Sequence, residues 1–194
     1  MTAPTFSPID AISRNRFPSV STHFGRDECV VGATEHGIDI QTIPPGVWNR
    51  MVALAGAILE PWRQDVGPLQ VTRWYANEAL NKAQGGVQDS QHMLGEAIDV
   101  VPVGMNVRLA YEKLLRGSYS QNIDQVILYP RRNFIHVSHK SDRSDVRPNR
   151  LEHLFSPWGK SALVRRAGKR KYFDYEKWWS TYEQMGPRDF GVKF

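Results

Sequence analysis

Two short apolar segments in the second half of the chain constrain the fold more than any other feature. Residues Ile123–Tyr129 and Phe134–Ser138 are separated only by the four residues Pro-Arg-Arg-Asn. Apolar runs of this length that flank a short turn-forming sequence are typical of a β-hairpin. We therefore expect two antiparallel strands at this point of the chain.

The spacing of apolar residues elsewhere predicts two more strands and two helices. Apolar residues recur with helical spacing over Gly46–Arg63, where Pro61 is expected to weaken the end of the helix, and again over Val107–Arg116. Leu69–Tyr75 and Ile98–Val101 are typical of strands. Because these elements mix without a run of βαβ units, we predict an α+β fold with a small antiparallel sheet flanked by helices.

The basic residues are concentrated in the last third of the 194-residue chain. Residues 1–130 hold 10 basic and 13 acidic side chains, whereas residues 131–194 hold 15 basic and 7 acidic ones. We predict an N-terminal arm over residues 1–22, a folded domain over 23–140, and a basic, aromatic-rich C-terminal extension over 141–194 with a helix at Asp174–Gln184. A basic segment of this kind is either a solvated face or a surface that attracts an acidic partner.

Several classes of protein are excluded by what the sequence lacks. Cys29 is the single cysteine, so a disulfide framework and a cysteine-rich zinc site are ruled out, and we expect Cys29 to be a buried apolar filler. No apolar stretch reaches the roughly 18 residues of a membrane span, and the N-terminal residues lack the apolar run of a signal peptide. We expect neither a membrane nor nucleic acid as a partner.

The residues most suited to chemistry lie in Ser90-Gln-His-Met-Leu-Gly-Glu-Ala-Ile-Asp99. His92 and Asp99 are seven residues apart, and Asp99 begins an apolar strand, where a charge is costly unless it is paired or bound to a metal. His136 lies in the middle of another apolar strand. Two histidines and one carboxylate are typical of a catalytic zinc site with an open fourth position. The alternative is a core histidine and a carboxylate that caps a strand.

The composite motif resembles that of the M15 family of zinc peptidases, which includes D-Ala-D-Ala carboxypeptidases and related peptidoglycan peptidases, many from phages. The segments 33–39, 71–86 and 124–127 are also similar to those of phage members, and the resemblance covers roughly residues 23–140. It implies that His92, Asp99 and His136 bind Zn²⁺.

The chain departs from the family pattern at two functional positions. The family arginine that holds a substrate oxygen is replaced by Ala76. Strand alternation predicts that Arg73 and Tyr75 point to the same face, so Arg73 is the nearby arginine that could substitute. The family also needs a carboxylate near the last histidine, but the matching positions hold Asn133 and Tyr129. Acidic residues that could stand in are Glu96, Asp124 and Asp142.

The resemblance implies a zinc metallopeptidase, either a carboxypeptidase or an endopeptidase, that acts on peptidoglycan peptides. Tyr129 and Asp124 are candidates for the catalytic groups, Arg73 and Ser90 are candidates for binding substrate, and His139 is expected at the surface. The lack of a signal peptide suits a phage product found in the virion or the host cytoplasm and acting on the cell wall. The alternative is a non-catalytic tail or baseplate protein that keeps the fold and contacts other virion proteins through residues 141–194.

Overall fold

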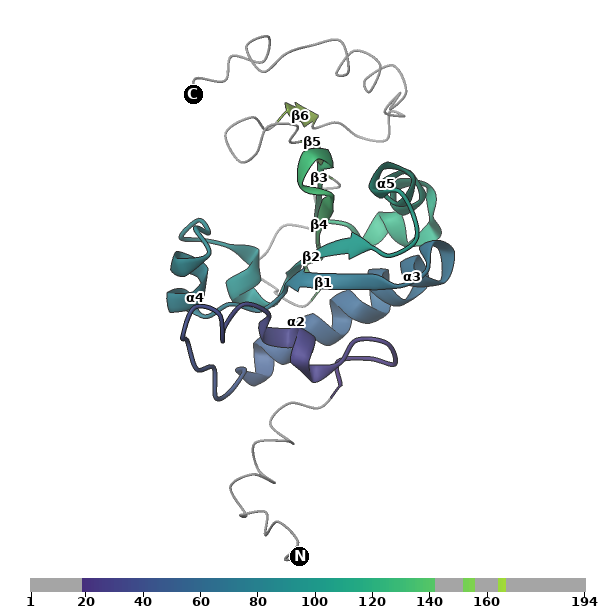
Figure 1. The fold of residues 1–194 in the computed structure, drawn as a ribbon. Coiled ribbons are helices and arrows are strands. Elements are labelled where there is room, and N and C mark those ends of the chain that lie inside the picture. Colours follow the sequence, from purple (N-terminus) through teal and green to yellow (C-terminus); the bar gives the residue numbers. More distant parts are fainter. Residues whose placement is uncertain (1–18, 142–151, 156–163, 167–194) are drawn as a thin grey trace, which may run out of the picture.

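A computed structural model describes residues 19–141, 152–155 and 164–166 of the chain (Figure 1). The predicted helix at Asp174–Gln184, the alternative carboxylate Asp142 and most of the basic extension lie outside the described residues. The predicted division into an arm, a domain and an extension therefore stays a prediction.

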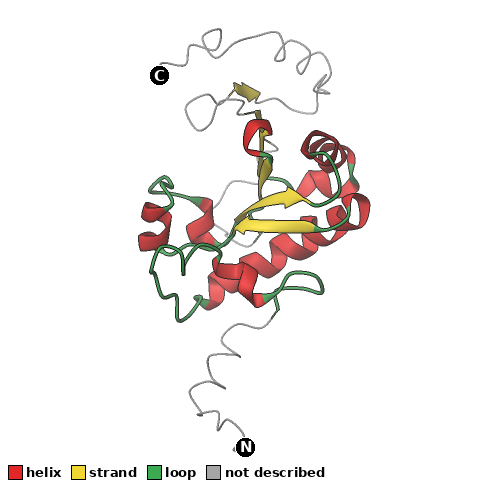
Figure 2. Cartoon of the chain, in the orientation of Figure 1, coloured by secondary structure: helices red, strands yellow, loops and turns green. Residues whose placement is uncertain are grey.

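The centre of the fold is a sheet in which four antiparallel strands lie side by side (Figure 2). Their spatial order is β1 (Leu69–Arg73), β2 (Ala97–Pro102), β4 (Phe134–Ser138) and β3 (Gln125–Tyr129). The predicted hairpin is confirmed, because β3 and β4 pair directly and Tyr129 lies opposite Phe134. With helices beside this sheet, the α+β class is also confirmed.

Two short strands continue the sheet beyond β3. The strand β5 (Glu152–Phe155) pairs with β3 in parallel, and β6 (Val164–Arg166) pairs with β5 in antiparallel orientation. Both lie within the segment predicted as a C-terminal extension. The sequence analysis did not foresee that this segment contributes strands to the sheet.

A long helix runs from Pro45 to Val66 along one side of the molecule (Figure 1). It consists of α2 (Pro45–Leu54), a π-helical segment (Ala55–Leu59) and α3 (Glu60–Val66). The predicted helix is confirmed, but it continues three residues past its predicted end at Arg63, so Pro61 does not end it. Proline lacks an N–H group and its ring clashes with a carbonyl of the preceding turn. The wider π-helical segment just before Pro61 can accommodate that ring.

The other helices are short, and their first turns are capped by asparagine. In α5 (Val107–Arg116), which has the predicted bounds, the side chain of Asn106 accepts a hydrogen bond from Arg108 N. In α4 (Glu78–Ala83), Asn77 accepts one from Leu80 N. The short 3-10 segments are Arg26–Val30, Gln91–Leu94, Ser118–Asn122 and Pro130–Arg132. Among the described residues, none of the helices is both long and apolar enough to cross a membrane.

The two faces of the sheet differ in character. One face is covered by the long helix and α5, and the Trp62 indole N–H donates to the Ala110 carbonyl where α3 meets α5. Side chains that alternate along the strands complete this core, including Val71, Ile98, Val100, Val126, Leu128, Ile135 and Val137. The opposite face carries the polar residues singled out in the sequence.

The chain from Val20 to Phe24 is attached to the long helix through one carboxylate. Glu60 accepts hydrogen bonds from the Ser21 hydroxyl at 2.6 Å, from His23 N at 3.0 Å and from His23 Nδ1 at 2.7 Å. Burial of Glu60 alone would raise its pKa, but these hydrogen bonds outweigh burial and lower the pKa below its ordinary value of 4.5. Val20 and Phe24 are thereby held in the core, where both are buried.

We predict that Glu60→Gln lowers the free energy of unfolding by about 1–2 kcal/mol at pH 7, because it weakens three hydrogen bonds to a charged acceptor. The pKa of Glu60 is lower in the folded protein than in the unfolded chain, so its stabilising effect is present above about pH 4.5 and is lost as the pH falls below that value. Urea unfolding of both proteins at pH 7 and pH 3 measures the difference. An equal difference at both pH values would contradict this account.

Candidate functional site

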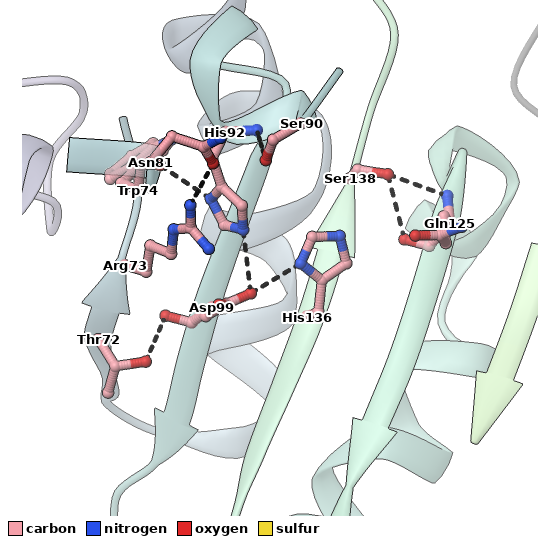
Figure 3. Close-up of polar contacts among 10 residues, drawn as sticks. All are labelled: Thr72, Arg73, Trp74, Asn81, Ser90, His92, Asp99, Gln125, His136 and Ser138. Atoms are coloured by element: carbon pink, nitrogen blue, oxygen red, sulfur yellow. Dashed lines mark hydrogen bonds and ion pairs between the residues drawn. The ribbon is translucent and has the colours of Figure 1, made fainter. Parts of the chain in front are cut away.

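Three of the predicted residues meet on the open face of the sheet. His92, Asp99 and His136 each offer one ligand atom, and these atoms all lie within 4.8 Å of one another. Figure 3 shows Asp99 between the two imidazole rings. Asp99 Oδ1 is 3.4 Å from His92 Nε2 and 2.7 Å from His136 Nδ1. The structure therefore brings the three candidate metal ligands together.

Strand register explains how two of these side chains meet. Asp99 on β2 lies directly opposite His136 on β4, and His136 lies opposite Ile127 on β3. Paired residues of adjacent strands point to the same face of a sheet. Asp99 and His136 are 37 positions apart in the sequence, yet they are direct neighbours across the sheet.

His92 is supplied by a turn beside the sheet rather than by a strand. It lies in the 3-10 segment Gln91–Leu94, whose first turn is capped by Ser90 Oγ, which accepts from His92 N at 3.4 Å. The segment ends at Gly95 with φ of 73°, and a Cβ atom there would lie 2.6 Å from the Val47 carbonyl oxygen. Only glycine fits this left-handed turn against helix α2. Ser90, predicted to bind substrate, has its hydroxyl engaged as a helix cap.

The orientation of His92 leaves one ring nitrogen available to a cation. Its Nδ1 is 2.8 Å from the Trp74 carbonyl oxygen, an acceptor, so Nδ1 carries the proton and donates it. In the neutral ring the lone pair is then on Nε2, which faces Asp99 Oδ1. Burial lowers the pKa of His92, although the charge of Asp99 opposes this shift. A neutral nitrogen and a carboxylate oxygen that face each other are both acceptors, so a cation between them would be stabilised.

The pKa of Asp99 favours the ionised carboxylate that a metal needs. Burial alone would raise this pKa, but the two neighbouring imidazoles, with the hydrogen bond from His136 Nδ1, bring it well below its usual range.

The distances test whether the residues fit a metal. Two atoms bound to one tetrahedral zinc ion at about 2.0–2.1 Å lie about 3.3 Å apart. The 3.4 Å between His92 Nε2 and Asp99 Oδ1 matches that spacing. The 2.7 Å between His136 Nδ1 and Asp99 Oδ1 is the length of a hydrogen bond, so this pair would separate slightly to hold an ion. Donor types and positions therefore fit a zinc ion.

The three residues lie in a cavity of about 600 Å³. Predicted site residues Arg73, Ser90 and Tyr129 also line it, whereas Asp124 is not among the lining residues. Burial, followed by the charge of Asp99, raises the pKa of Tyr129 to about 12, so its hydroxyl stays protonated and can donate near neutral pH.

Arg73 reaches the cavity through a β-bulge. Val71 lies opposite Val100, but Arg73 rather than Thr72 lies opposite Asp99, so Thr72 is one extra residue in β1. The prediction that Arg73 and Tyr75 share a face is wrong: Arg73 lines the cavity, whereas Tyr75 is buried in the main core. The strand ends at Arg73, so its alternation does not extend to Tyr75.

Arg73 is held in place by Asn81 and Gly86, two residues that the sequence analysis missed. Its Nη2 donates to Asn81 Oδ1 at 2.7 Å (Figure 3). Asn81 Nδ2 in turn donates to the Val87 carbonyl at 2.8 Å. Gly86 provides the space, since a Cβ atom there would overlap the Asn81 side chain and lie 2.8 Å from Arg73 Nη2. Arg73 Nε is buried without a hydrogen-bond partner among the described residues.

Two of the carboxylates predicted as stand-ins for the missing acidic residue are buried, although one of them, Glu96, also lines the cavity. Glu96 and Asp124 are fully buried, and the Gln91 amide contacts both, at 3.5 Å and 3.0 Å. Arg50 lies 3.9 Å from Glu96 and Lys140 lies 3.4 Å from Asp124. These contacts are those of a structural charge network.

One acidic residue that the sequence analysis missed is accessible from the cavity. Asp89, which is exposed, lines the cavity three residues before His92. Its position next to the Ser90–Asp99 motif is the signal that could have identified it.

Two further predictions concern His139 and Cys29. The prediction that His139 lies at the surface is wrong, because His139 is buried. Its backbone N–H donates to the Glu96 carbonyl, and its ring Nδ1 contacts the Asn122 carbonyl at 2.7 Å. The strand β4 ends at Ser138, so strand alternation does not place His139. Cys29 is buried as predicted, and burial raises the pKa of its thiol to about 12.

Comparison with known proteins agrees with this geometry. A family model described as Peptidase M15 matches residues 22–138, more than half of the chain. This range includes His92, Asp99 and His136. None of the curated proteins matches the chain at a significant level.

We predict that Gly86→Ala displaces the Arg73 guanidinium, because the added methyl group would occupy the space of the Asn81 amide. The side-chain Nε–H signal of Arg73 in a proton–nitrogen NMR spectrum, assigned by its loss in Arg73→Lys, reports the displacement. Gly56→Ala is the matched control, since a Cβ atom at Gly56 meets nothing within 4 Å. An unmoved Arg73 signal in Gly86→Ala would contradict the assigned role of Gly86.

Proposed function

The chain belongs to the M15 peptidase family, and from that premise we propose that it is a zinc-dependent peptidase that cleaves peptide cross-links of bacterial peptidoglycan. The observation that carries the proposal is the meeting of His92, Asp99 and His136 in one cavity. A zinc ion bound there would lower the pKa of a water molecule and polarise the substrate carbonyl.

The side chains around the three ligands have separate roles in this proposal. Asp99 and His136 are fixed by the sheet, and His92 is oriented by the Trp74 carbonyl. The Arg73 guanidinium, held by Asn81, would donate to a substrate oxygen and so replace the family arginine whose position is Ala76. The Tyr129 hydroxyl would donate to the oxygen on which negative charge develops.

We assign the proton acceptor to Asp89. The reaction needs a carboxylate that takes a proton from water and passes it to the leaving amine. Asp89 is exposed and lines the cavity. Glu96 also lines it but is fully buried near Arg50 and Gln91, and Asp124 is fully buried beside Gln91 and Lys140. An enclosed and paired carboxylate cannot exchange protons with water without breaking its contacts.

The biological setting of the proposal rests on resemblance alone. The segments 33–39 and 71–86 are similar to those of phage members of the family. We therefore propose a phage-encoded enzyme, either an endolysin or a tail-associated protein that acts on the host cell wall. In the second case residues 141–194 would contact other virion proteins.

A non-catalytic virion protein that keeps the fold is the second candidate. The observation that favours it is the substitution of two functional positions, because Ala76 is buried in the main core and Tyr129 stands where relatives have a carboxylate. This candidate differs from the first in turnover and not in fold or zinc content, so one experiment distinguishes them.

We predict that the purified protein contains about one zinc ion per chain and releases new amine groups from purified peptidoglycan. His92→Ala should lose both properties, because it removes one ligand from a site that needs all three. His36→Ala is the matched control, since His36 is exposed and does not line the cavity. Zinc without amine release would identify the non-catalytic protein, and a protein without zinc would contradict both candidates.

We predict that Asp89→Asn lowers kcat by about 10²–10⁴-fold while zinc content is unchanged, because it removes the proton acceptor and no metal ligand. Glu96→Gln should instead lower the melting temperature and keep most of kcat, because Glu96 belongs to a buried network. Steady-state kinetics, zinc analysis and thermal unfolding of both variants measure these effects. The reverse pattern, with kcat lost only in Glu96→Gln, would move the proton acceptor to Glu96.

A further inference from the structure

The cavity continues along strand β4 beyond the candidate metal ligands. His136 lies opposite Ile127, and the next pair on the same face is Phe134 opposite Tyr129. Residues two apart in a strand are separated by about 6.6–6.8 Å. The Tyr129–Phe134 pair therefore lies about 7 Å along the sheet from the His136–Ile127 pair, within the reach of the same bound peptide.

Three side chains at this end form an apolar surface of their own. Ile127, Tyr129 and Phe134 make a small cluster separate from the main core, and all three line the cavity. The rings of Tyr129 and Phe134 stack with centroids 4.3 Å apart and an angle of 16° between their planes. Strand alternation places them on the face opposite the core residues Leu128 and Ile135. Apolar side chains on the wall of a cavity gain free energy when a ligand covers them.

The turn between the strands adds a positive charge to this end. Arg132 lines the same cavity, and its charge acts on the Tyr129 hydroxyl. The turn Pro130–Arg132 ends at Asn133, whose φ of 55° returns the chain into β4 with Phe134 opposite Tyr129. An apolar surface next to a guanidinium suits a peptide residue with an apolar side chain followed by a carbonyl or carboxylate oxygen.

We propose that Ile127, Tyr129 and Phe134 form a subsite for an apolar side chain of the substrate residue next to the cleaved bond, with Arg132 binding the oxygen that follows. The proposal rests on the proposed peptidase function and names the substrate residue that this enzyme would prefer. A sugar ring is the less suitable occupant, because its hydroxyls need several polar partners and the three cluster residues offer one hydroxyl.

The test uses two series of synthetic peptidoglycan stem peptides and the zinc-loaded, full-length protein. In one series the residue before the cleaved bond is D-alanine, D-2-aminobutyrate, D-norvaline or D-serine. In the other series the residue after the bond carries the same substitutions. We expect KM to fall by up to about fourfold for each added methylene in one of the two series, and D-serine to give no such gain.

Two variants connect the preference to the cluster. Phe134→Ala should remove the dependence of KM on side-chain length, and Phe134→Leu should keep part of it. Leu109→Ala is the matched control, because Leu109 is an exposed apolar residue that does not line this cavity. The preference is measured on the wild-type protein first, so the inference is tested even if one of the variants does not fold.

The outcomes separate this inference from the proposed function. If the wild-type protein cleaves the peptides with equal KM across both series, the subsite is rejected and the peptidase remains. If it cleaves none of the peptides and no peptidoglycan, the proposed function itself is rejected. If a glycan chain without its peptides binds more tightly than the stem peptides, the aromatic pair is a sugar site, which also contradicts the inference.

Discussion

The placement of one carboxylate, Asp99, governs the arrangement of the site. A charge on a central strand is costly unless it is compensated, and here both compensating groups are histidines. Each histidine is in turn fixed by the backbone, His136 by the register of β2 and β4 and His92 by the Trp74 carbonyl. The sheet, the turn Gln91–Leu94 before β2 and the Trp74 carbonyl after β1 must therefore all be in place before the three side chains can meet.

The two faces of the sheet have different roles, because one packs into the main core and the other carries the candidate site. One face is covered by the long helix and α5 and forms the main core, whereas the other face carries Asp99 and His136 and continues to Tyr129 and Phe134. The bulge at Thr72 adds Arg73 to the second face, although strand alternation would have placed it in the core. The extra residue in β1 thus supplies a cation where the position matching the family arginine holds Ala76.

Local sequence patterns predicted much of the fold, and long-range contacts explain most of what they missed. The helix Val107–Arg116 and the hairpin of β3 and β4 follow from periodicity and turn residues, and the proximity of the three candidate ligands followed from a composite motif. The bulge, the π-helical segment before Pro61 and the burial of His139 depend on which strands and helices meet. The pairing of Arg73 with Asn81 is equally invisible in the sequence order, whereas the position of Asp89 beside the Ser90–Asp99 motif could have identified it.

The central claim is that His92, Asp99 and His136 together hold a zinc ion. X-ray absorption at the zinc edge of the purified protein tests it most directly, because nitrogen and oxygen ligands at about 2.0–2.1 Å are distinguished from sulfur at about 2.3 Å. The account predicts imidazole and oxygen ligands without sulfur, and a changed spectrum in His136→Ala. A sulfur ligand would point to Cys29, which is buried away from the cavity, and would contradict the account, as would a protein that binds no zinc.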